Sequence, residues 1–421
     1  MAYSEYIKSA IDFLLKMQND DGGIKISNRD SKISGIWTTA ESLDAIITSN
    51  FLSIDISIFD EIIRMMDYLK TKFIVCAENP ECGYWEIAEG RGASTMTTGH
   101  SIRALQICLN KVFHCCDIKK ITLSTKEIVV ADFVSDIKAC IDKAVRWLQF
   151  QQQVDGGWSY ADINSNEKSS ILATYYVLLG LNCVGKNCGN DSYVSKSCLF
   201  IKRIIENILE TKQYSQDSLA EILYAYPCLY SSGYFTQSDT HFKTRMMKFI
   251  NHHWREIKSC MAVHDLHHKT IPFINNLPYI ALNAVLTVED YTYETKIRKL
   301  IAYFVSQRKL DGSWGVLKND VEDTTWVTAE AILALSQVQH TYQTYYNKIV
   351  ASKQIRLFKV SSIALGLICS LFLLYYFFTS VIPTGTEPAN IDYWKTIPSF
   401  IFGVLGAATS IFSIIDIVKK R

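Results

Sequence analysis

The stretch WTTAESLDAI at residues 37–46 returns as WVTAEAILAL at residues 326–335, near the other end of a chain of 421 residues. The two copies share Trp, Thr, Ala and Glu at their first, third, fourth and fifth positions, and Ala at the ninth. Apolar residues three and four apart are typical of an amphipathic helix. A match between segments so far apart indicates internal repetition, so we expect a fold built from copies of one helical unit.

A turn motif precedes helices of this kind. It occurs in AIDFLLKMQNDDGGI at residues 10–24, AVRWLQFQQQVDGGW at 144–158 and LIAYFVSQRKLDGSW at 300–314. Each segment begins with a helical apolar stripe and ends in Asp, Gly and an apolar residue. Asp and Gly stop a helix through turn chemistry and a left-handed backbone conformation. The repeated unit is therefore predicted to be helix, turn, helix.

This register predicts six helix pairs. The first helices are expected at 3–18, 58–73, 134–152, 194–210, 241–258 and 292–308, and the second helices at 37–46, 97–105, 173–181, 217–225, 277–285 and 326–335. No pair buries its apolar face alone, so the pairs are expected to close as an inner ring within an outer ring. The predicted fold class is all-α, a single (α/α)6 barrel over residues 1–345; an open helical solenoid is the alternative.

The repeats resemble those of the terpenoid cyclase and protein prenyltransferase superfamily, which includes squalene-hopene cyclase. The resemblance covers about residues 3–340. It implies that the motif residues tie neighbouring helices together, a role that falls on Gln18, Gln152, Trp158, Gln307 and Trp314. The first copy departs from the pattern, because Ile24 stands where Trp is expected.

The resemblance also implies where a catalytic acid is expected. Class II cyclases protonate an alkene with a DxDD motif, and the nearest sequence here is Asp320-Val321-Glu322-Asp323, with Glu322 as the proton donor. The motif is out of register with the helix after it, so Asp323 also fits a helix cap. The DDxxD motif that holds magnesium for diphosphate ionisation is missing. The sequence therefore leaves open whether the protein is an enzyme.

Superposing the repeats places a second set of candidates inside the ring. Glu41, His100 and Glu330 occupy equivalent positions of three neighbouring inner helices and are predicted to face the lumen at one height. Such a set is suited to acid–base catalysis or to a divalent metal ion as cofactor. The alternative is a group of salt bridges, for example Asp44 with Arg103 and Glu41 with His100.

Ligand binding is predicted for residues beside this set, namely Asp44, Arg103, Tyr176 and Tyr224. Under the resemblance, aromatic faces such as those of Tyr176 and Tyr224 stabilise a carbocation; aromatic core packing explains them equally well.

The end of the chain is strongly apolar. We expect a basic linker at 346–359, transmembrane helices at 360–382 and 396–417, and an external loop at 383–395, because each apolar run is long enough to cross a bilayer. Lysine and arginine flank the two runs, which predicts a two-pass membrane protein with the toroid and both termini in the cytoplasm. The membrane is thus a predicted partner. A stripe of small residues around Gly406 further predicts a homo-oligomer, because small residues let transmembrane helices of this hairpin pack closely.

The balance of charged residues argues against one class of function, nucleic-acid binding. With 43 basic and 42 acidic residues the chain has no electrostatic support for a nucleic-acid partner. The 12 scattered cysteines are expected to be buried and inert thiols.

Two interpretations of function stay open. In the first, the toroid cavity binds an isoprenoid or other lipid-like small molecule and cyclises or transfers it. In the second, the protein is a non-enzymatic membrane sensor or effector: the toroid binds a ligand or partner, and the two-helix hairpin oligomerises or perturbs the membrane.

Overall fold

The computed structural model describes residues 4–27, 33–50, 56–113, 119–123, 126–161, 167–211, 216–235, 239–253, 261–265, 272–287, 294–315 and 324–339, together with Gly366, Leu371 and Phe372. The chain divides into two compact units, Met1–Tyr342 and Gln343–Arg421. The first unit holds nearly all of the described residues.

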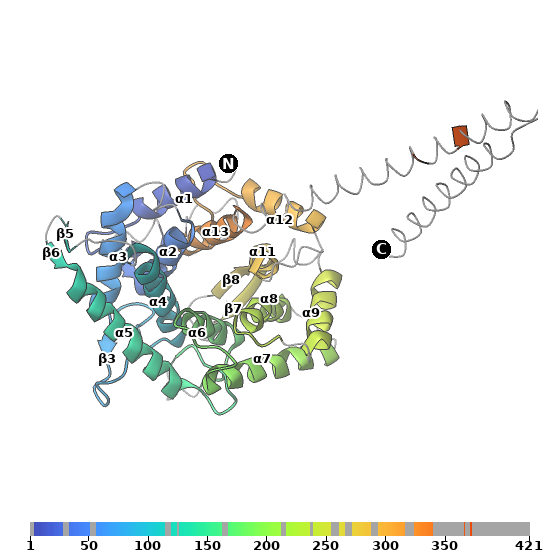
Figure 1. Ribbon diagram of the computed structural model, residues 1–421, viewed down its shortest axis with the longest axis horizontal. Helices are drawn as coiled ribbons and strands as arrows, with labels where there is room; N and C mark the ends of the chain where they lie inside the picture. The colour runs from blue at the N-terminus through green and yellow to red at the C-terminus, as the bar shows by residue number, and fades with distance from the viewer. Residues whose placement is uncertain are drawn as a thin grey trace, which may run out of the picture. The chain divides into compact units, whose positions relative to one another are not determined.

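The first unit is mostly helical, and its helices alternate between two concentric layers (Figure 1). The outer layer contains α1 (Ser4–Lys16), α3 (Phe59–Thr71), α5 (Val130–Gln151), α7 (Ser192–Thr211), α9 (Thr240–His252) and α12 (Glu294–Ser306). The inner layer contains α2 (Ile36–Thr48), α4 (Thr95–Cys108), α6 (Ile171–Cys183), α8 (Gln216–Ser231), α11 (Leu277–Thr287) and α13 (Thr325–Gln337). Each helix range predicted from the sequence overlaps one of these helices.

The inner helices contact one another in chain order, and α13 contacts α2, so the layer closes into a ring. Figure 1 shows the first and last repeats side by side. Hydrogen bonds between residues far apart in the chain join these two repeats: Thr325 N–H and Oγ1–H both donate to the carbonyl of Ile26, at 3.2 and 2.9 Å. The fold is therefore an α/α toroid, and the alternative of an open solenoid is wrong.

Burial explains why the layers take these positions. In α1 the buried residues are Ile7, Ala10, Ile11, Phe13 and Leu14, a stripe with the three- and four-residue spacing of a helix that covers a core on one side. In α2 every residue from Thr38 to Ile47 is buried. A helix buried all round belongs inside the ring.

Short antiparallel hairpins join some of the helices. They pair β1 (Ile24–Lys25) with β2 (Ser34–Gly35), β3 (Ile74–Val75) with β4 (Gly83–Tyr84), β5 (Lys120–Leu123) with β6 (Lys126–Val129), and β7 (Met261–Asp265) with β8 (Pro272–Asn276). A 3₁₀ turn at Ile56–Ile58 precedes α3, and a π-helical turn at Leu109–Phe113 comes after α4.

One hydrogen bond recurs where the turn meets the inner helix. A backbone N–H at the end of the turn donates to the hydroxyl of a buried threonine in the first turn of that helix. The pairs are Ile24 with Thr39 at 2.8 Å, and Trp85 with Thr98, Trp158 with Thr174 and Trp314 with Thr328 at 3.0 Å each. Trp85 supplies the tryptophan of the second repeat, which the sequence motif alone did not reveal.

Two of the motif glutamines tie outer helices to each other, a role that the family resemblance implied. Nε2 of Gln18 donates to the carbonyl of Glu61 in α3 at 3.0 Å, and Nε2 of Gln152 donates to the carbonyl of Tyr193 in α7 at 2.8 Å. The assignment of Gln307 to this role is wrong, because the third copy is shifted by one residue. Arg308 stands there instead and donates from Nη2 to Ser9 Oγ at 3.0 Å, which joins α12 to α1.

In the described residues no helix is both long enough and apolar enough to cross a membrane. This finding contradicts the prediction of a two-pass membrane protein with a cytoplasmic toroid. Apart from Gly366, Leu371 and Phe372, the segments 346–359, 360–382, 383–395 and 396–417 lie outside the described residues.

The turn glycines allow a test of the repeat geometry. Gly156 has φ +94°, and a Cβ atom on it would lie 2.6 Å from the carbonyl oxygen of Lys196; Gly22 has the same surroundings against Arg64. Gly185 has φ +81° but open space around it. We expect Gly156→Ala to lower the free energy of unfolding by about 1–3 kcal/mol more than Gly185→Ala, because only the first adds a clash to the backbone strain. Urea unfolding measures both variants, and equal losses would show that the turn does not hold α5 against α7.

Candidate active site

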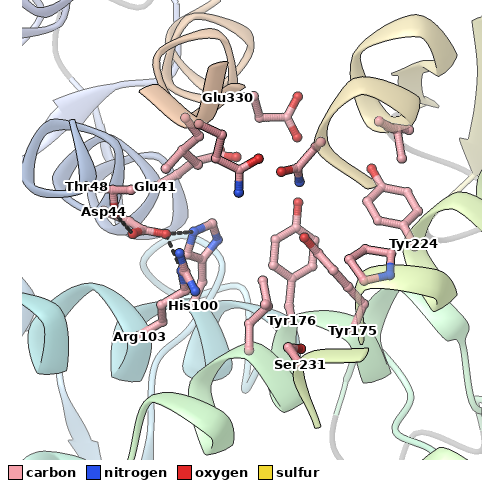
Figure 2. A pocket seen from close by; sticks show the side chains of 16 residues that line it. Glu41, Asp44, Thr48, His100, Arg103, Tyr175, Tyr176, Tyr224, Ser231 and Glu330 are labelled. Atoms are coloured by element: carbon pink, nitrogen blue, oxygen red, sulfur yellow. Dashed lines mark hydrogen bonds and ion pairs between the residues drawn. The ribbon is translucent and has the colours of Figure 1, made fainter. Parts of the chain in front are cut away.

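A cavity of about 150 Å³ lies among the inner helices, and all six of them line it (Figure 2). Its lining residues are Glu41, Asp44 and Thr48 from α2; His100 and Arg103 from α4; Tyr175, Tyr176 and Leu179 from α6; Tyr224, Pro227 and Ser231 from α8; Ile280 and Asn283 from α11; and Glu330, Leu333 and Gln337 from α13.

The repeat explains why these side chains meet. In the four inner helices that carry the buried threonine, the residue two positions after it is Glu41, His100, Tyr176 or Glu330, and the residue five positions after it is Asp44, Arg103, Leu179 or Leu333. Residues three apart lie on one face of a helix. Because the threonine hydrogen bond sets these four helices at the same height, their equivalent residues enter the cavity together.

Asp44 is the most strongly bound side chain of the cavity. It is 1% exposed, and Arg103 Nε donates to its Oδ2 at 2.6 Å. Thr48 Oγ1 donates to Oδ1 at 2.9 Å, and His100 Nε2 lies 3.6 Å from Oδ2. Burial opposes ionisation of Asp44, but the attraction of Arg103 and His100 is stronger and holds its pKa well below the usual range. Asp44 therefore stays ionised, and its charge is balanced by Arg103.

The pKa values of Glu41 and Glu330 are raised, whereas that of Asp44 is lowered. Burial raises the pKa of Glu330 to about 8. Burial also raises the pKa of Glu41 well above its usual range, with further contributions from the charges of Glu330 and Asp44. Glu41 is 1% exposed, and within the described residues its Oε2 accepts no hydrogen bond. At neutral pH this pair holds protons, so the cavity contains two proton donors beside one ionised carboxylate.

Aromatic rings form the opposite wall. His100 stacks on Tyr176 with centroids 5.0 Å apart and planes at 25°. Tyr175 touches both Tyr176 and Tyr224, each at 5.1 Å between centroids. Figure 2 shows the hydroxyl groups of Tyr176 and Tyr224 directed toward the same space as Glu330. Burial raises the pKa of both tyrosines, so they stay neutral and can donate hydrogen bonds.

The structure thus brings together seven of the eight residues singled out from the sequence. Glu41, His100, Glu330, Asp44, Arg103, Tyr176 and Tyr224 all line the cavity, whereas Glu322 lies outside the described residues. The salt bridge between Asp44 and Arg103 is present, but His100 pairs with Asp44 and not with Glu41. In the part of the chain that the structure describes, no group of three His, Cys, Asp or Glu side chains is arranged to hold a metal ion.

Sequence reasoning did not single out Asn283, Gln337 or Ser231, which also line the cavity. Gln337 comes after Thr328 by the same spacing that separates Thr48 from Thr39. The register set by the threonines would have found it. Neither α8 nor α11 carries a threonine at the equivalent position, so no such signal exists for Ser231 and Asn283.

By sequence, no protein-family model matches the chain, and no characterised protein does. Solved structures share its fold. A GH76 α-mannanase from Bacteroides thetaiotaomicron has 9% identity and a TM-score of 0.56, with 82% of this chain and 97% of that chain covered. A GH76A α-1,6-mannanase from Salegentibacter sp. HEL1_6 has 6% identity and a TM-score of 0.52, with 80% and 98% covered. A sugar epimerase from a ruminal bacterium has 12% identity and a TM-score of 0.51, with 81% and 99% covered.

These findings overturn the resemblance to terpenoid cyclases and prenyltransferases, since the toroids found belong to carbohydrate-active enzymes. The physical reason is that the motif residues carry the fold: they cap turns and join helices, and none of them lines the cavity. The isoprenoid or lipid ligand is wrong for a second reason. Glu41, Asp44, His100, Arg103 and Glu330 place titratable groups in the lining, and burying such groups against a hydrocarbon ligand is costly.

The raised pKa of Glu330 generates a prediction about stability. An unfolded glutamate loses its proton at about pH 4.3, whereas folded Glu330 keeps it up to about pH 8. Between these values the unfolded state binds fewer protons, so the free energy of unfolding falls as pH rises, and above about pH 8 the fall ends. We expect the Glu330→Gln variant to lack this fall. Between pH 5 and pH 8 its free energy of unfolding should therefore rise by about 1–3 kcal/mol relative to that of the wild type.

Urea unfolding from pH 5 to 8.5 measures the effect. Glu210→Gln is the matched control, because Glu210 is an exposed glutamate on α7. Parallel pH curves for wild type and Glu330→Gln would contradict a Glu330 that stays protonated in the folded protein.

Proposed function

We propose that this protein is a glycoside hydrolase that cleaves a bond of a neutral sugar in the central cavity. The observation that carries the proposal is the pair of carboxyl environments within one cavity: Glu330 holds its proton to about pH 8, while Asp44 stays ionised. Carboxyl groups whose pKa values are pushed apart are the usual acid and base of glycoside hydrolysis. The shared fold with mannanases supports the reaction class and does not decide it.

Each group has a role in this proposal. Glu330 donates its proton to the glycosidic oxygen, and Glu41 beside it shares in holding that proton. Asp44 supplies negative charge for the positive charge that develops on the sugar ring. His100, oriented by Asp44, takes a proton from the attacking water. Its Nδ1 accepts no hydrogen bond within the described residues and so is available to a ligand.

The cavity favours a neutral sugar. Arg103 is already neutralised by Asp44 at 2.6 Å, so no uncompensated cation of the lining attracts a carboxylate or phosphate. Stacked tyrosines and protonated carboxyls suit the faces and hydroxyls of a sugar ring. At about 150 Å³ the space is smaller than the roughly 300–1,000 Å³ of typical ligand pockets, which fits one sugar unit.

An inactive variant of the Salegentibacter mannanase has two consecutive aspartates replaced by asparagine, and it was crystallised with α-1,6-mannotriose. The lining of the present cavity contains no two consecutive carboxylates. The groups proposed here therefore come from three helices: the acid Glu330 from α13, the charged Asp44 from α2 and the base His100 from α4.

The six-pair form of the toroid belongs to the same proposal. We infer an (α/α)6 barrel spanning the predicted residues 1–345. Two observations support it. The inner helices α2, α4, α6, α8, α11 and α13 form a ring, and one helix of the outer layer precedes each of them in the chain.

The test is hydrolysis of a panel of neutral aryl glycosides and oligosaccharides that includes α-1,6-mannotriose. We expect at least one to be cleaved, with kcat/KM falling above about pH 8 as Glu330 loses its proton. Glu330→Gln is expected to lower kcat/KM roughly 10²–10⁴-fold while the Kd for the sugar stays within a few-fold. Glu210→Gln is the control and should behave as wild type.

The outcomes separate three cases. Sugar binding without cleavage would identify a binding protein, and a changed sugar configuration in the product would identify an epimerase. If no neutral sugar binds, or if Glu330→Gln cleaves as fast as wild type, the proposal is wrong.

A further inference from the structure

Two cysteines outside the cavity lining lie against each other. Cys188 is in the turn between α6 and α7, and Cys198 is in the second turn of α7. Their Sγ atoms are 3.1 Å apart. The composition suggested inert thiols, yet this pair has the proximity that a disulfide bond requires after a small movement.

Backbone hydrogen bonds hold Cys188 in this place. Its N–H donates to the carbonyl of Ser232 at the end of α8 at 3.0 Å, and Ser195 Oγ donates to its carbonyl at 2.7 Å. The turn is therefore fixed to α8 on one side and to α7 on the other. When a disulfide reagent has reacted with one of two thiols that the fold holds together, the second thiol displaces it faster than a separate thiol would.

The two thiols differ in access and in acidity. Cys188 is half-buried, whereas Cys198 is fully buried. The hydrogen bond between them lowers the pKa of Cys188 against the opposing effect of burial, and it raises the pKa of Cys198. The thiolate is the nucleophile in thiol–disulfide exchange, so Cys188 is the thiol that reacts first with a reagent from solution.

We propose that Cys188 and Cys198 form a reversible modification site, at which a small-molecule disulfide such as oxidised glutathione joins them by a disulfide bond. The Cys188 thiolate attacks one sulfur of the reagent and releases the first small thiol. Cys198 then attacks Cys188 in the mixed disulfide, releases the second small thiol and passes its proton to it. The two cysteines together lose two electrons, which reduce the reagent to two thiols.

The link acts on a wall of the cavity. Cys188 binds the carbonyl of Ser232, and the preceding residue, Ser231, lines the cavity. A bond between Cys188 and Cys198 closes a short loop of chain and fastens the turn that rests on this end of α8. Cross-links restrict the unfolded chain more than the folded one, so oxidation is expected to raise Tm. This inference does not depend on the proposed glycoside hydrolase activity.

The experiment uses the full chain, incubated with either oxidised or reduced glutathione, alkylated and digested with trypsin. Lys196 separates the two cysteines, so trypsin places them in the peptides 187–196 and 197–202, which stay joined only through a disulfide. We expect the joined peptides after oxidation, together with a Tm raised by a few degrees. Reduction should reverse both changes.

Three variants sharpen the test. Cys188→Ser should form no link and no glutathione adduct in this region, whereas Cys198→Ser should keep glutathione bound at Cys188, because nothing resolves the mixed disulfide. Cys140→Ser replaces a half-buried cysteine on α5 and is the matched control that should behave as wild type. Circular dichroism confirms that each variant is folded. The proposal is overturned if both thiols of the wild type stay alkylatable, or if Cys188 joins Cys183 or Cys228 instead.

Discussion

The hydrogen bond from the turn backbone to a threonine hydroxyl is the interaction on which the inner ring depends. It recurs at Thr39, Thr98, Thr174 and Thr328, each of them fully buried. A buried N–H without a partner is costly, so each turn can meet its helix in one position only. Once four inner helices are set at one height, the residues that come after each threonine point into a common space.

The polar groups in that space are stabilised in two different ways. Asp44 and Arg103 neutralise each other, and removing one partner of such a buried pair commonly costs about 3–5 kcal/mol because the other charge stays behind. Glu41 and Glu330 have no cation of their own in the lining and instead retain protons. One cavity therefore contains an ionised carboxylate, Asp44, beside two protonated carboxyl groups, Glu41 and Glu330. That combination costs stability, and a catalytic function is the reason we propose for its presence.

The motif residues illustrate how fold and chemistry separate. Gln18, Gln152, Trp158 and Trp314 bind backbone carbonyls of their own or neighbouring helices, so they would serve any toroid of this kind whatever it binds. The resemblance built on them suggested terpenoid chemistry, yet mannanases share the same fold at 9% and 6% identity, so residues that hold the toroid together do not identify its chemistry. The lining residues occupy equivalent positions of the repeats but differ in chemical type from one repeat to the next. The function therefore depends on these residues and not on the motif.

The sequence by itself determined the repeat, the approximate helix ranges and the meeting of Glu41, His100 and Glu330, because the apolar periodicity and the register of repeated segments are properties of the chain that folding does not change. It left an open solenoid as the alternative to a ring, and only the contact between α13 and α2 decided between them. It misassigned Gln307, since a shift of one residue in the third copy is visible only when Arg308 is seen to reach Ser9. Only the tertiary structure decided that His100 pairs with Asp44, that Asn283 and Ser231 enter the cavity, and that Cys188 meets Cys198. These contacts join different elements, and their distances depend on how helices pack and turns fold back, which spacing along the chain does not encode.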